Sequence, residues 1–188
     1  MKKSVRIFAG LFILSTIVFF VTNSGEELIL RWQMNTFRYS EVVERYSEMM
    51  DIDSNLVYAI IKRESNFRVN AVSHVGASGL MQIMERTAVD VSERMGFHDF
   101  SMDNIFEPEV NIRIGAWYIS HLLSLYDGNL INALAAYNAG QGNVNEWLSD
   151  PYHVGESGSL RNIPFTETRE YVERVLSTMQ MLERINRR

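Results

Sequence analysis

The stretch IIKRESNF, residues 60–67, closes an apolar helical face with a glutamate, Glu64. Ile60, Val57 and Leu56 precede Glu64 by four, seven and eight positions, and side chains at this spacing share one face of an α-helix. Such a face is typical of a helix buried in a core. A carboxyl group at its end is costly to ionise, because burial disfavours the charged form.

The periodicity leaves two roles open for Glu64. In the first, its carboxylate is ion-paired with Arg63 or Arg68, or is solvated at the end of the helix. In the second, apolar surroundings raise its pKa and make it a general acid, as the cleavage of a glycosidic bond requires. Spacing alone does not choose between these interpretations.

The composition limits the classes of protein to consider. The chain has 188 residues, 46% of them hydrophobic, which suffices for the core of one globular domain. Its net charge of −5 offers no basic surface, so we expect no nucleic-acid partner. The chain has no cysteine and four isolated histidines, so we expect neither a metal site nor a cofactor.

Residues 1–23 have the pattern of an export segment. An uncharged apolar run of 15 residues, 7–21, follows three basic residues and precedes two glutamates, which predicts that the rest of the chain lies outside the cytoplasmic membrane, in the cell envelope. Two interpretations stay open: a signal anchor that contacts the membrane through residues 7–22, or a cleaved signal peptide. We expect residues 24–37 to be a linker and residues 38–188 to form one domain.

Helical spacing predicts that this domain is all-α, with many short helices and no strand. Asp53 or Ser54 is expected to cap the helix that carries Glu64, and Pro108 suits the first turn of a long helix. We expect helices at residues 39–50, 56–64, 80–84, 87–95, 108–126, 131–137, 144–148 and 166–185. Glycines and polar clusters predict loops at residues 66–79, 96–108 and 149–164, and a turn at residues 138–142.

Four short motifs occur in order along the domain: ES at residues 64–65, GLMQIM at 79–84, AYNAG at 136–140 and IPFTETREYV at 163–172. Together they resemble the catalytic domain of the soluble lytic transglycosylase family, and the resemblance covers roughly residues 38–186. It implies a goose-type-lysozyme-like multi-helix fold and an enzyme that acts on peptidoglycan glycan strands. Residues 38–188 are then the catalytic domain, behind an N-terminal hydrophobic anchor helix.

The resemblance also implies roles for individual residues. Glu64 matches the catalytic acid/base of the family. The residues that match substrate-binding positions are Ser65, Ser73, Met81, Gln82, Met84, Tyr137, Asn138, Glu167 and Tyr171. Purely structural roles stay open for four of these residues. Met81 and Met84 could belong to the core, Tyr137 could serve packing alone, and Glu167 could cap the last helix. One departure is Glu85, where the pattern leads us to expect proline.

The implied reaction cleaves the β-1,4 bond between N-acetylmuramic acid and N-acetylglucosamine and leaves a 1,6-anhydromuramyl end. Glu64 donates a proton to the glycosidic oxygen and later takes one from the muramyl 6-hydroxyl group. Two alternatives stay open: a hydrolytic muramidase on the same scaffold, in which water replaces that hydroxyl group, and a non-catalytic cell-wall-binding module.

Overall fold

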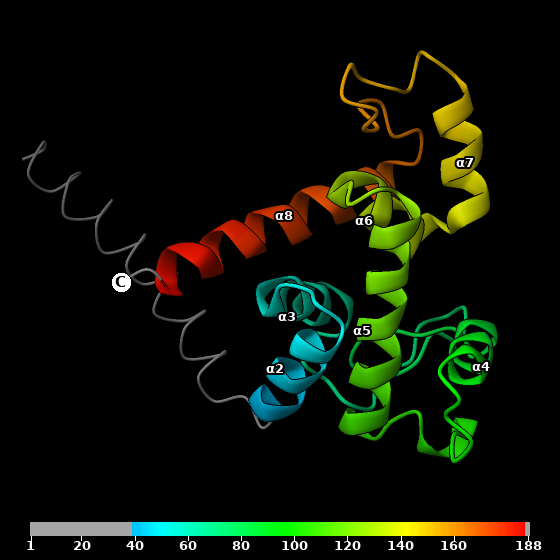
Figure 1. The fold of residues 1–188 in the computed structure, drawn as a ribbon, viewed down its shortest axis with the longest axis vertical. Coiled ribbons are helices and arrows are strands. Elements are labelled where there is room, and N and C mark those ends of the chain that lie inside the picture. The colour runs from blue at the N-terminus through cyan, green and yellow to red at the C-terminus, as the bar shows by residue number, and fades with distance from the viewer. Residues whose placement is uncertain (1–38, 187–188) are drawn as a thin grey trace, which may run out of the picture. The chain divides into compact units, whose positions relative to one another are not determined.

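The computed structural model describes residues 39–186 (Figure 1). The predicted export segment, with its hydrophobic anchor helix, and the linker of residues 24–37 lie outside the described residues. Within residues 39–186 the chain forms seven α-helices, one short 3-10 helix and no strand, only isolated β-bridges. The α-helices are α2 (Ser40–Met49), α3 (Ser54–Glu64), α4 (Glu85–Arg94), α5 (Pro108–Leu125), α6 (Leu130–Ala139), α7 (Gln141–Ser149) and α8 (Thr166–Asn186), and the 3-10 helix is η1 (Met102–Asn104). The all-α prediction is confirmed.

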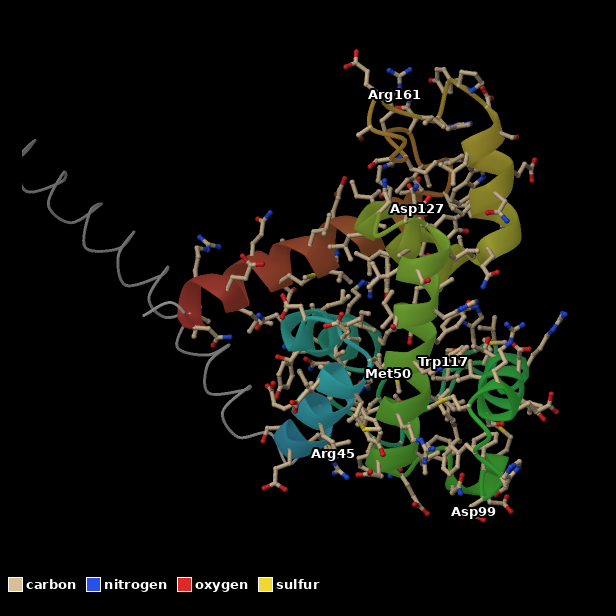
Figure 2. The ribbon with its side chains drawn as sticks, viewed as in Figure 1. Arg45, Met50, Asp99, Trp117, Asp127 and Arg161 are labelled. Carbon is tan, nitrogen blue, oxygen red and sulfur yellow. The ribbon has the colours of Figure 1, made fainter. Side chains whose placement is uncertain are left out.

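The boundaries of α3 and α5 follow from local chemistry. The carboxylate of Asp53 accepts a hydrogen bond of 2.8 Å from the backbone N–H of Asn55, which caps α3 as expected. Pro108 occupies the first turn of α5, where its missing N–H costs nothing. Asp127, at the end of α5 in Figure 2, and Gly128 both have positive φ angles, which turn the chain into α6.

Helix α5 is the central element of the domain. It packs against α2, α4 and α6, and Figure 1 shows it between α2 and α3 on one side and α4 on the other. Its Ile112, Ile119 and Leu122 are fully buried. Helix α3 is buried on all sides, because every residue from Leu56 to Ile61 is buried. No helix within residues 39–186 is long and apolar enough to cross a membrane.

Two local predictions are wrong. Residues 79–84 form turns bounded by the bridge between Ser78 and Ile83, not a helix. Gly79 and Gln82 in this segment have φ angles of +80° and +49°, which a right-handed helix excludes. The turn expected at residues 138–142 is reduced to one residue, Gly140, whose φ of +86° separates α6 from α7.

The side chain of Asn111 holds the turn segment of residues 79–84 against α5. Its amide nitrogen donates to the carbonyl oxygens of Ser78 and Ile105, at 3.0 and 2.9 Å. Its amide oxygen accepts from the backbone N–H of Met81 at 2.8 Å. The amide is fully buried, and a Cβ atom at Gly79 would lie only 2.2 Å from its nitrogen. Only glycine therefore fits at this contact.

We predict that Asn111→Ala lowers the free energy of unfolding by roughly 2 kcal/mol or more. The N–H of Met81 and the carbonyl of Ile105 lose the bond from Asn111, at about 1–3 kcal/mol each, whereas the carbonyl of Ser78 keeps its bond from the N–H of Ile83. Urea unfolding of the full chain measures the loss. Asn162→Ala is the control, because Asn162 is exposed and its side chain donates to the carbonyl of Tyr152 at the protein surface, so a change below about 0.5 kcal/mol is expected. Equal losses in both variants would contradict the role given to Asn111.

Candidate active site

Glu64 is the last residue of α3, and its partly buried carboxyl group interacts electrostatically with Tyr137 of α6 and with Tyr171 and Glu167 of α8. Burial raises its pKa from 4.5 to about 7. Hydrogen bonding from the Tyr171 hydroxyl group and the charge of Arg63 lower this pKa, whereas the charge of Glu167 raises it. The net result is a carboxyl group that holds and releases a proton near neutral pH.

Tyr171 of α8 is 1% exposed, and its hydroxyl group approaches the Glu64 carboxyl group. The contact is looser than a standard hydrogen bond, so within residues 39–186 this buried oxygen has no well-formed partner. Catalytic hydrogen bonds are often long before substrate binds. Burial, followed by the charge of Glu64, raises the pKa of Tyr171 well above its ordinary value, so the phenol stays a donor.

Tyr137 of α6 is fixed by two contacts. Its hydroxyl group donates to the carbonyl oxygen of Met81 at 2.9 Å, and its ring lies 5.3 Å from that of Tyr118 on α5. Burial raises its pKa well above the ordinary value, and the charge of Glu64 adds to the effect. Tyr137 therefore ties α6 to the turn segment that carries Met81, at a place where its phenol feels the charge of Glu64.

The other residues of the GLMQIM motif shape the turn. The amide nitrogen of Gln82 donates to the carbonyl oxygens of Ala71 and Gly79, at 3.0 and 2.9 Å, so it holds the loop together. Met81 is fully buried and packs on Gly115, where a Cβ atom would lie 2.3 Å from its sulfur atom. Met84 is 43% exposed and is free to meet a ligand.

The remaining predicted site residues make local contacts. Ser65 is buried and its hydroxyl group donates to the carbonyl of Ile61, so it supports the end of α3. The Ser73 hydroxyl group accepts from the N–H of Ala77 at 2.9 Å, within its own loop. The side-chain oxygen of Asn138 accepts from the Thr168 hydroxyl group at 2.7 Å, which ties α6 to α8.

The structure thus places Glu64, Tyr137, Tyr171 and Glu167 together electrostatically, whereas Ser65, Ser73, Gln82 and Asn138 bond to their own surroundings. Sequence reasoning missed three residues of this region, which are Asn111, Tyr118 and Thr168, and it considered Arg63 only as an ion-pair partner of Glu64. The sequence does indicate a role for Asn111. A polar side chain four positions before Gly115, on the same face of an apolar helix, predicts that this face packs against the backbone of a neighbouring segment. Within the described residues, no group of three or more acidic or histidine side chains is arranged to hold a metal ion.

The raised pKa of Glu64 has a consequence for stability. The pKa of Glu64 is higher in the folded protein than in the unfolded chain, so the folded protein binds its proton more tightly. The stabilisation that this proton gives is fully present below about pH 4.5 and is lost as pH rises through about 7. We predict that Glu64→Gln, which cannot ionise, increases the free energy of unfolding, and that this gain is about 3 kcal/mol larger at about pH 8 than at about pH 4.

Urea unfolding at the two pH values measures this difference. The matched control is Glu156→Gln, because Glu156 is an exposed carboxylate in the loop between α7 and α8. A gain in Glu64→Gln that does not change with pH would show that the folded protein ionises Glu64 as easily as the unfolded chain does.

Comparison with known proteins identifies relatives. A family model described as the transglycosylase SLT domain matches residues 41–158. The soluble lytic murein transglycosylase of Salmonella typhimurium is 38% identical over 141 residues, which are 74% of this chain and 22% of that protein. The membrane-bound lytic murein transglycosylase C of Edwardsiella ictaluri is 34% identical over 170 residues, covering 79% of this chain and 47% of that protein.

Solved structures show the same likeness. The 70-kDa soluble lytic transglycosylase in complex with bulgecin A superposes with a TM-score of 0.74 and 34% identity, over 80% of this chain and 25% of that one. An inactive glutamate-to-glutamine mutant of the lytic transglycosylase Slt from Pseudomonas aeruginosa gives a TM-score of 0.72 and 38% identity, over the same shares of each chain. The chain spans about a fifth of the length of the first curated relatives. Because the family model covers more than half of its residues, the chain belongs to the transglycosylase SLT domain family.

Proposed function

We propose that this chain is a peptidoglycan lytic transglycosylase that cleaves the β-1,4 bond between N-acetylmuramic acid and N-acetylglucosamine, with Glu64 as its acid and base. The observation that carries the proposal is the Glu64 carboxyl group, whose pKa of about 7 lets it serve in both forms. The names of the relatives support the substrate class, since they act on murein. The Pseudomonas aeruginosa structure, titled an inactive glutamate-to-glutamine mutant, supports the use of one carboxyl group.

In the first step, protonated Glu64 gives its proton to the glycosidic oxygen, and the bond from that oxygen to the anomeric carbon of the muramyl residue breaks. The acetamido oxygen of the same sugar stabilises the electron-poor carbon, so no second protein carboxylate is needed as a nucleophile. In this proposal the Tyr171 hydroxyl group, which approaches Glu64, donates to the carboxylate formed in this step.

In the second step, the Glu64 carboxylate takes the proton of the muramyl 6-hydroxyl group. The oxygen of that group attacks the anomeric carbon and displaces the acetamido oxygen, which closes the 1,6-anhydro ring and regenerates protonated Glu64. No water is consumed. In this proposal Ser73, Gln82, Met84 and Asn138 bind the saccharide, and Tyr137 holds the turn segment of residues 79–84 against α6 through its bond to Met81.

The setting of the domain belongs to the same proposal. Residues 38–188 are the catalytic domain, in a goose-type-lysozyme-like fold, and residues 24–37 link it to the export segment. Residues 7–22 anchor it to the membrane or leave with a signal peptide, and the domain works outside the cytoplasmic membrane. The charge pattern around the apolar run supports this orientation, and the relatives include both soluble and membrane-bound enzymes by name.

We predict that the full chain releases anhydromuropeptides from purified peptidoglycan and that Glu64→Gln lowers the rate by at least about 100-fold, because the general acid is lost. Mass spectrometry identifies the products, since an anhydro end is lighter than a reducing end by one water molecule. Glu156→Gln is the control and is expected to retain full activity.

The products distinguish the alternatives. Reducing ends would make the enzyme a hydrolytic muramidase on the same scaffold. If a folded protein gives no products from several peptidoglycan types, the chain is a non-catalytic wall-binding module and the proposed function is wrong. Activity retained by Glu64→Gln would contradict the role of Glu64 alone.

A further inference from the structure

Arg63, the residue before Glu64, has two features that the reaction above does not use. The central carbon of its guanidinium group lies 5.8 Å from the centroid of the Tyr171 ring, within the range of a cation–π contact. Its Nε atom is buried and has no hydrogen-bond partner within residues 39–186. A buried donor without a partner is costly, so its presence in a folded protein needs an explanation.

The same explanation is needed for Tyr171. In the described part of the chain only three buried side-chain polar atoms lack a hydrogen-bond partner, and they are Arg63 Nε, the Tyr171 hydroxyl oxygen and Ser47 Oγ. Two of the three belong to residues that interact with the Glu64 carboxyl group. They come from different helices, α3 and α8, and meet through the contact between the guanidinium group and the phenol ring. Both of these donors without partners therefore belong to residues that interact with the same carboxyl group, that of Glu64.

We propose that Arg63 is a positioning residue: its guanidinium group packs on the ring of Tyr171 and holds the Tyr171 hydroxyl group toward Glu64, ready for the carboxylate that forms when Glu64 gives up its proton. The catalytic meaning of this inference rests on the proposed function, whereas the contact between Arg63 and the Tyr171 ring does not depend on it. Arginine suits the task better than lysine, because a planar guanidinium group stacks on an aromatic ring and cannot lose its charge.

The electrostatics around Glu64 agree with this role. The groups that face its carboxyl group are Arg63 on its own helix, Tyr137 from α6, and Tyr171 and Glu167 from α8. Burial and the Glu167 charge raise the pKa of Glu64, whereas Tyr171 and Arg63 lower it. Without the last two, the pKa of Glu64 would be higher, and its carboxyl group would give up its proton less readily in the first step.

The test follows the titration of Glu64 directly, by ¹³C NMR of its carboxyl carbon in the full chain. Arg63→Gln removes both charge and stacking, and Arg63→Lys keeps the charge alone. Tyr171→Phe keeps the ring and removes the hydroxyl group, and the double variant Arg63→Gln/Tyr171→Phe closes the cycle. The matched control is Arg174→Gln, because Arg174 lies exposed on α8 and pairs with Glu170 at 3.9 Å.

We expect Arg63→Gln and Tyr171→Phe each to move the midpoint of the Glu64 titration to higher pH, by on the order of one pH unit or less. Arg63→Lys is expected to lie between Arg63→Gln and the unaltered protein. The double variant is expected to shift by less than the sum of the single shifts, because the arginine acts through the tyrosine. In the cleavage assay, the fall in rate at alkaline pH moves upward in parallel.

Several results would overturn the proposal. They are an unshifted midpoint in Arg63→Gln, shifts that add fully in the double variant, and an Arg63→Lys protein that titrates like the unaltered one. Thermal unfolding identifies a variant that fails to fold, and Arg63→Lys and Tyr171→Phe then carry the test. The NMR titration does not depend on cleavage. An unaltered chain that fails to cleave peptidoglycan therefore refutes the proposed function while the positioning contact is still judged by its own result.

Discussion

The buried amide of Asn111 is the contact on which the geometry of the site depends. It satisfies three backbone groups in two loops, and one of them is the N–H of Met81. The carbonyl of Met81 in turn accepts the hydrogen bond of Tyr137, whose phenol feels the charge of Glu64. A side chain on α5 therefore fixes the backbone group to which a tyrosine of α6 is hydrogen-bonded, and that tyrosine feels the charge of a glutamate of α3. Because the amide is fully buried, solvent offers no replacement for these bonds.

Glu64 illustrates how the core produces a carboxyl group of raised pKa at the cost of stability. The completely buried run from Leu56 to Ile61 delivers its carboxyl group to a place where ionisation is unfavourable. Polar neighbours offset part of this cost, but two of them, Arg63 and Tyr171, each keep a buried polar atom that has no hydrogen-bond partner within residues 39–186. Buried polar atoms without partners are tolerated mainly at functional sites. A carboxyl group in a solvated position would not lower the stability of the fold in this way, but it would be ionised at neutral pH and could not act as a general acid.

The sequence predicted the regular helices well, because their signals are local. Asp53 and Pro108 marked two helix starts, and apolar spacing located the long final helix. It failed at residues 79–84, where an apolar run looked helical. The turn there depends on a positive φ at Gln82 and on hydrogen bonds to Asn111, about 30 residues away in the chain. No local pattern contains such a contact, so short-range periodicity gave the wrong structure.

The site divides in the same way. Glu64 stood out as an anomaly in a helical pattern, but only the resemblance of ordered motifs favoured catalysis over an ion pair. Arg63 was considered as a partner for Glu64 and not for Tyr171, since the two meet only when α8 returns to α3. The face of α5 was readable in principle: Asn111, Gly115 and Tyr118 follow at helical spacing, and together they hold the turn, admit Met81 and contact Tyr137. One face of α5 thus contacts both the turn segment of residues 79–84 and Tyr137. A small or polar residue on an apolar helix face marks a place where a neighbouring backbone packs closely against the helix.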